Sequence, residues 1–148
     1  MNKIYGLRQH WLLLIFILLD TVCVGMGMGV PFFCILFGFI VGWFLVKAIT
    51  IPYTDILQVL QKVLRYAILA AGITCVEMLL LWLPLASYFF NPTKDLAETG
   101  IPMILYEPRA SLIGWIILMI VISPFLQLLT ILFSAHLTII WSTNKRLA

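Results

Sequence analysis

The chain is 148 residues long, the size of a single domain, and 64% of it is hydrophobic while only 10% is charged. A soluble domain is about 45–50% apolar and about 25% charged, so a domain of this size could not bury so much apolar surface in its own interior. The net charge of +3 comes from basic residues at the edges of apolar segments. This placement argues against nucleic-acid binding and predicts an integral membrane protein whose first partner is the lipid bilayer.

The apolar segments predict an all-α bundle of four transmembrane helices that forms one domain, residues 1–148. A spanning helix needs about 20 mostly apolar residues. The first expected span covers residues 11–27 and the second covers 31–48, with a glycine-rich turn between them. The start resembles a signal peptide, but no small-residue cleavage site follows and Asp20 falls where the apolar run should end, so we expect a retained helix.

The rest of the chain predicts two more spans and one segment of a different kind. Residues 52–66 alternate apolar and polar positions at helical spacing, which predicts an amphipathic helix on the membrane surface or an extension of the third span, 67–90. A loop rich in proline and charge covers 91–110. The fourth span, 112–141, is longer than the ~30 Å hydrocarbon layer, so it must tilt, protrude or kink, and Pro124 is the natural kink.

The basic residues predict how the chain is oriented. In a four-span topology most of them fall on one side of the membrane and two fall on the other. The first group is Lys3, Arg8, Lys47, Lys62, Arg65, Lys145 and Arg146, and the second is Lys94 and Arg109. Because cytoplasmic loops carry the excess of lysine and arginine, we expect both termini in the cytoplasm and the chain in the cell or inner membrane.

Two expected spans contain a single carboxylate each: Asp20 in the first and Glu77 in the third. A charged side chain at the centre of a helix in the bilayer costs about 2.5–3.5 kcal/mol on insertion scales. Each carboxylate must therefore be protonated, paired or close to water. Two interpretations remain open, a proton or cation site that Asp20 and Glu77 share, or hydrogen bonds that fix helix packing.

The fourth span carries polar residues on one helical face. They recur at steps of three and four residues and comprise Ser123, Gln127, Thr130, Ser134 and Thr138. Such residues form hydrogen bonds between membrane helices or line a path for water. Gln127 is the best candidate to meet Asp20 or Glu77, so Ser123, Gln127, Thr130 and Ser134 join the two carboxylates as candidates for a proton, ion or interhelical polar site.

Small residues predict close helix packing on the second and third spans. Small side chains spaced four residues apart allow two helix backbones to approach, within one bundle or between chains. The second span offers Cys34, Gly38 and Gly42, and the third offers Ala67, Ala71 and Cys75.

The sequence offers no catalytic motif, no phosphate-binding loop and no set of metal ligands. The three cysteines, Cys23, Cys34 and Cys75, are not paired in a C-x-x-C motif, so we expect buried apolar side chains. No cofactor is predicted. His10 and His136 lie at similar depth near the cytoplasmic interface, which leaves a haem or a quinone there as a remote alternative.

These features favour a non-enzymatic accessory or structural subunit of a larger membrane complex, which would contact other subunits or a second copy of itself through its small-residue faces. The alternative is a small oligomeric ion channel or proton-coupled transporter that uses Asp20 and Glu77. The absence of a catalytic motif makes an enzyme the least favoured of the three.

Overall fold

The computed structural model describes residues 2–25, 30–50, 56–84, 87 and 107–147, and the secondary structure there is helical. The elements in chain order are α1 (Asn2–Gly25), α2 (Val30–Thr50), α3 (Ile56–Trp82), α4 (Pro108–Ile117), the π-helical turn η4 (Leu118–Ile122) and α5 (Ser123–Leu147). The all-α architecture expected from the sequence is thus confirmed for the described residues.

Among the described residues, three helices are long and apolar enough to cross a membrane: Val30–Ile49, Ile56–Trp82 and Arg109–Ser142, the last of which runs through α4, η4 and α5. In α1 the apolar part is Leu14–Gly25, which is shorter than the ~20 residues of a full span. These lengths identify a membrane protein with an all-helical bundle. They do not by themselves establish a fourth crossing.

The third helix differs from the expected span at both ends. Residues 56–66 form its first turns without a break, so this part of the amphipathic segment is a helix extension, while 51–55 lie outside the described residues. At the other end α3 stops at Trp82, before the expected end at residue 90. Pro84 explains this, because proline cannot donate to the helix and disfavours helical geometry in the residue before it. Of the predicted loop, only residues 107–110 are described.

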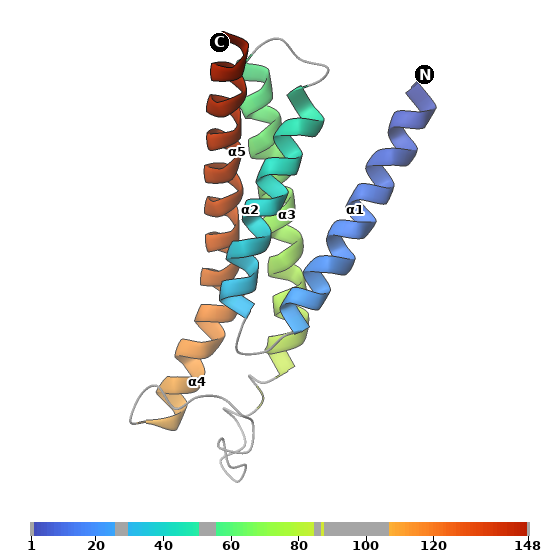
Figure 1. Ribbon diagram of the computed structural model, residues 1–148. Helices are drawn as coiled ribbons and strands as arrows, with labels where there is room; N and C mark the ends of the chain where they lie inside the picture. The colour runs from blue at the N-terminus through green and yellow to red at the C-terminus, as the bar shows by residue number, and fades with distance from the viewer. Residues whose placement is uncertain (1, 26–29, 51–55, 85–86, 88–106, 148) are drawn as a thin grey trace.

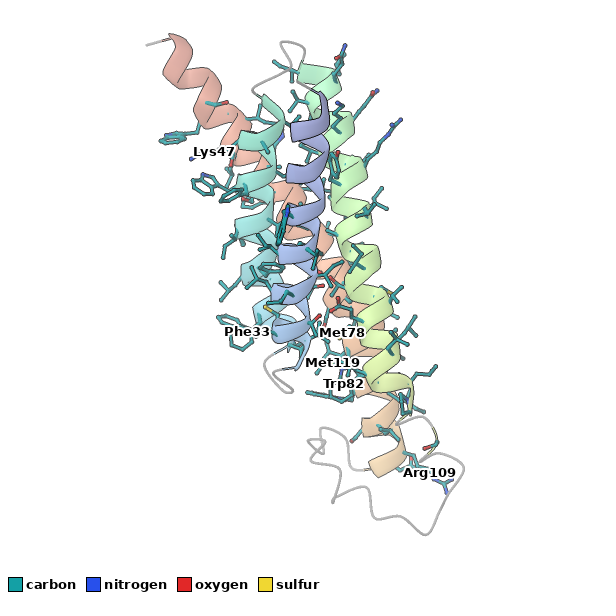
Figure 2. The ribbon with its side chains drawn as sticks, turned by 90° about the vertical axis from the view of Figure 1, so that its right-hand side faces the viewer. Phe33, Lys47, Met78, Trp82, Arg109 and Met119 are labelled. Atoms are coloured by element: carbon teal, nitrogen blue, oxygen red, sulfur yellow. The ribbon has the colours of Figure 1, made fainter. Side chains whose placement is uncertain are left out.

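Both ends of the chain lie at the same end of the bundle (Figure 1), which we call the termini end. The opposite end, where α1 and α3 stop and α4 begins, we call the far end. Helices α2, α3 and α5 run side by side, whereas α1 meets them near the far end and leans away from them toward its N-terminus (Figure 1). Figure 2 places Lys47 near the termini end and Arg109 at the far end.

The closest helix contact lies between α2 and α5, at the two glycines of the small-residue face. A Cβ atom on Gly38 would meet the Thr130 side chain and lie 2.9 Å from the Gln127 carbonyl oxygen. One on Gly42 would meet the Ile131 carbonyl. Only glycine permits this approach, because the opposing atoms belong largely to the backbone and cannot move aside.

The helix that contains Pro124 is interrupted by a π-helical turn rather than continuing as a regular α-helix. Proline lacks the N–H that would bond the carbonyl four residues earlier, and Cys75 Sγ on α3 donates to that carbonyl, Ile120 O, at 3.6 Å. The Leu118 carbonyl accepts from both the backbone N–H of Ser123 and its hydroxyl, the latter at 2.8 Å. The carbonyls that the kink releases are therefore satisfied by side chains, as required inside a membrane.

The interior consists of three apolar clusters stacked along the bundle. The cluster nearest the termini end contains Val46, Ile49, Val59, Val63 and Ala135. The middle cluster contains Ala67, Ala70 and Ile131. The cluster at the far end contains Val24, Val30, Cys34, Met78, Trp115 and Met119.

On α3 the buried positions recur at steps of four, four, three, four and four residues, and they are Val59, Val63, Ala67, Ala70, Thr74 and Met78. Ala67 is thus a buried position of the middle cluster. Ala71 and Cys75 lie on the flank of this stripe and are only partly buried. The step of three after Ala67 moves the contact from Ala71 to Ala70, because a helix turns through 3.6 residues.

Candidate proton or cation site

Three helices bring polar side chains together between the middle and far-end clusters. The Asp20 side chain on α1 is fully buried. Its carboxylate accepts a hydrogen bond from the Thr74 hydroxyl on α3, with Oγ1 2.5 Å from Oδ2. It accepts another from Gln127 on α5, with Nε2 3.2 Å from Oδ1. Both donors are neutral, so the carboxylate is hydrogen-bonded but not neutralised.

The position of Asp20 follows from the apolar residues one turn to either side of it. Phe16 stacks on Phe37 of α2 with ring centroids 5.4 Å apart, and Val24 is buried in the far-end cluster. Residues four apart share a helix face, so these two contacts turn Asp20 toward the interior. Other apolar side chains of α1, Leu18 and Val22 among them, are exposed.

Glu77 lies one helical turn from Thr74 on α3 and is only partly buried. It is close enough to Asp20 for the two charges to interact, and the Thr21 hydroxyl lies within hydrogen-bonding reach of its carboxylate. That hydroxyl also donates to the Ile17 carbonyl of its own helix at 2.8 Å. The Glu77 Oε2 atom is buried and has no hydrogen-bond partner among the described residues.

The site combines two interacting carboxylates without a cation. Among the described residues, the groups that act on Asp20 or on Glu77 are neutral hydroxyls, an amide and the other carboxylate. Burial disfavours the charged form of a carboxylate and a second carboxylate within electrostatic range disfavours it further, so this arrangement favours a proton or a cation at the pair. The described residues contain no group of three or more histidine, cysteine or acidic side chains that could hold a metal ion.

The remaining polar candidates on α5 do not reach the carboxylates. The hydroxyl of Ser123 bonds Leu118 O in the π-turn, and that of Thr130 bonds Gln127 O at 2.9 Å. Ser134 donates across the helix interface to the backbone carbonyl of Phe39 on α2, at 2.7 Å. The polar residues on this face of α5 therefore fall into two groups. Gln127 belongs to the carboxylate site, whereas the hydroxyls bond backbone carbonyls.

The described cysteine and histidine side chains are not among those that form hydrogen bonds with the two carboxylates. Cys34 is buried, Cys23 and Cys75 are partly buried, and all three are free thiols. His136 is exposed and lines a shallow apolar groove between α3 and α5. The His10 side chain lies outside the described residues, so the structure does not bear on a haem or quinone between the two histidines.

Two features in or beside the site have only a weak sequence signal. Thr74 could be placed on the face of Glu77 by helical spacing, but its bond to Asp20 depends on how α1 packs. The indole N–H groups of Trp82 and Trp115, which lie in or pack against the far-end cluster beside the site, are the other feature, because both nitrogens are buried without a hydrogen-bond partner among the described residues. Tryptophan near a span end is ordinarily an interface anchor, so the sequence alone marks neither as part of a site.

Comparison with protein-family models, with curated proteins and with solved structures finds nothing significantly similar to this chain. The function must therefore be argued from the carboxylate site itself.

Proposed function

We propose that this protein is a small proton- or cation-coupled membrane transporter in which Asp20 and Glu77 hold the coupling ion. In this proposal α1 forms a fourth span, both termini are cytoplasmic and the far end faces outside. The observation that carries the proposal is the fully buried Asp20 carboxylate, which is held by two neutral donors beside a second carboxylate.

A structural role alone explains this arrangement poorly. If the only task of residue 20 were to join Thr74 and Gln127, an asparagine would serve without the cost of burying a charge. Intramembrane acids typically mark ion paths and proton relays. A pair of carboxylates also titrates as a unit, taking up protons in two separate steps, which suits a cycle of binding and release.

The basic residues support the proposed orientation. Seven of the nine lysines and arginines fall on the side of the termini, and the excess of positive charge marks the cytoplasmic side. Lys47 lies over the ring of Trp43 with Nζ 3.7 Å from the centroid, a pairing suited to the membrane interface at the termini end.

The test is proton movement in proteoliposomes with a trapped pH-sensitive dye and an imposed pH gradient. We expect the protein to dissipate the gradient at least tenfold faster than empty liposomes. Asp20→Asn and Glu77→Gln should lower this rate toward that of empty liposomes, because each removes a protonatable group and keeps the side-chain shape.

Ser134→Ala is the matched control, since it removes a buried polar contact outside the carboxylate site. It should transport at the normal rate. If Asp20→Asn and Glu77→Gln both fold and both transport normally, the carboxylates do not carry the coupling ion and the proposal fails.

A second candidate is the accessory subunit of a larger complex. The observation that favours it is α1, whose described side chains are mostly exposed apolar residues, with Leu14, Ile15 and Leu18 each more than half exposed. These side chains would pack against a helix of another subunit. Gentle solubilisation followed by native-size separation decides the matter. Migration with other subunits at a fixed ratio supports this candidate, and migration alone removes it.

A further inference from the structure

Among the described residues, the buried side-chain nitrogen and oxygen atoms that lack a protein partner are confined to one half of the molecule. There are four of them: Glu77 Oε2, Gln127 Oε1, Trp82 Nε1 and Trp115 Nε1. Trp115 and Gln127 are themselves at least nine-tenths buried. An unsatisfied buried polar group costs about 1–3 kcal/mol, so four of them in one region require an explanation.

Along the helix axes these atoms lie at successive levels from the carboxylate site toward the far end, and we call the four of them the polar column. Gln127 contacts Asp20 and therefore lies at the level of Thr74. At 1.5 Å per residue, Glu77 is ~4.5 Å and Trp82 is ~12 Å farther along α3. Trp82 packs edge-to-face against Trp115 of α4, with ring centroids 6.1 Å apart. Figure 2 shows Trp82 close to Met78 and Met119 near this end.

Among the described residues, the half of the bundle toward the termini contains none of these four atoms, although both halves contain buried apolar clusters. Between the carboxylate site and the termini end lie the middle cluster and the cluster around Val63. Ser134 and Thr138 also lie there, and both donate to backbone carbonyls, at 2.7 and 2.8 Å. The polar side chains that face α2 from this half of α5 are thus already paired.

The chemistry of the four atoms identifies what would satisfy them. The two oxygens need a donor, whereas the two indole N–H groups need an acceptor. A metal cation could serve the oxygens but not the indoles. Water both donates and accepts, and buried waters typically bridge two to four otherwise unsatisfied polar groups.

We propose that bound water fills this column and gives Asp20 and Glu77 access to protons from the far end alone. This inference rests on the proposed function, since it names the route by which that site exchanges its ion. Other titratable groups within electrostatic range of the carboxylates are the thiols of Cys23 on α1 and Cys34 on α2.

The test is thiol labelling in proteoliposomes with an anionic, membrane-impermeant methanethiosulfonate reagent. The three native cysteines are first replaced by alanine, and Glu77→Cys is then introduced alone. Ser87→Cys at the far end and Ser142→Cys near the termini end, in separate variants, report which side the reagent reaches. Ala67→Cys is the matched control because Ala67 is fully buried in the middle cluster.

We expect Glu77→Cys to react at least tenfold faster from the far end than from the termini end, and Ala67→Cys to react from neither. Equal reactivity from both sides, faster reaction from the termini end, or a Glu77→Cys as inert as Ala67→Cys would each overturn the proposal.

Hydrogen exchange of the unaltered protein provides a second test that needs no variant. The indole N–H groups of Trp82 and Trp115 should exchange with D₂O much faster than the backbone amides of α5 in the middle cluster. Indole protection equal to that of those amides would overturn the water column. This outcome differs from failure of the proposed function, because normal gradient dissipation by Asp20→Asn and Glu77→Gln would overturn the function whatever the labelling shows.

Discussion

The two halves of this bundle use similar polar residues in different ways. In the half near the termini, Ser134 donates to the Phe39 carbonyl of α2 and Thr138 donates to its own helix, and the two lie beside a contact so close that it requires Gly42. In the half near the far end, Asp20 is held by donors from two helices while Glu77 and Gln127 each keep an oxygen without a protein partner.

This difference distinguishes polar side chains whose hydrogen bonds hold helices together from polar side chains that keep an atom free to bind a ligand. A hydroxyl that donates to a backbone carbonyl has used its only proton, although its oxygen can still accept a hydrogen bond. A carboxylate oxygen without a partner can still bind a proton, a cation or water, and an amide oxygen can still bind a cation or water. Substitutions in the first half should therefore change stability, whereas under the proposed function those in the second should change proton movement as well.

The largest effect is expected at Gly42. Gly42→Ala places a Cβ in steric conflict with the Ile131 carbonyl oxygen, so α2 and α5 must separate, at a cost of about 3 kcal/mol. Gly72→Ala is the matched control, because nothing lies within 4 Å of its added Cβ, and alanine there should be neutral or stabilising by up to about 1 kcal/mol. Reversible unfolding in detergent micelles measures both. Equal stability of the two variants would show that the glycine contact does not hold the helices together.

The next largest effect is expected at Thr74. Thr74→Val keeps the shape of the side chain but removes the donor to Asp20, which should destabilise the protein by about 1–2 kcal/mol. Thr138→Val is the control, because its hydroxyl bonds only the Ser134 carbonyl of its own helix, and it should cost less than about 0.5 kcal/mol. The same unfolding assay applies. A loss at Thr138 as large as that at Thr74 would remove the distinction between the two halves.

A smaller effect is expected at Cys75, which links α3 to the π-turn. Cys75→Ala leaves the Ile120 carbonyl without its donor and should cost about 0.5–1 kcal/mol. Cys75→Ser supplies a hydroxyl donor and should restore most of the loss. If serine behaves like alanine in the unfolding assay, the cost reflects lost packing and not the released carbonyl.

The smallest effect is expected at Ser134. Ser134→Ala removes one hydrogen bond between helices, for which the average in a membrane protein is about 0.6 kcal/mol. Ser142→Ala, which removes a bond to the Ile139 carbonyl within the same helix, should cost less. Both should transport normally, and a transport defect in Ser134→Ala would extend the functional region beyond the far-end half.

The helices could be predicted from the sequence because long apolar runs bounded by proline, glycine and charge leave few alternatives. The helix that contains Pro124 was expected to tilt, protrude or kink, but the π-turn that accommodates this proline depends on Cys75 from another helix. Similarly, helical spacing offered Gln127 as a partner for either carboxylate without choosing between them. Gln127 bonds Asp20 because of how α1 is rotated about its own axis. The stacking of Phe16 on Phe37 and the burial of Val24 determine that rotation.

The polar column could not be predicted at all. Its members come from α3, α4 and α5, and an unpaired oxygen or indole N–H is a property of the assembled bundle rather than of any segment. For the hydroxyl residues of α5, the sequence showed the helical periodicity. It could not show that their hydroxyls bond backbone carbonyls.

The order of synthesis gives the Asp20 contacts a consequence for biogenesis. Thr74 and Gln127 lie 54 and 107 residues after Asp20 in the chain. While the ribosome is still making α3 and α5, the first helix has only a short apolar part, Leu14–Gly25, and carries a carboxylate that has neither donor. If α1 forms the fourth span as proposed, it should therefore remain at the insertion machinery or the membrane surface and enter the bilayer only once the last helix arrives. Truncated nascent chains that end before Gln127 would then leave α1 accessible to protease.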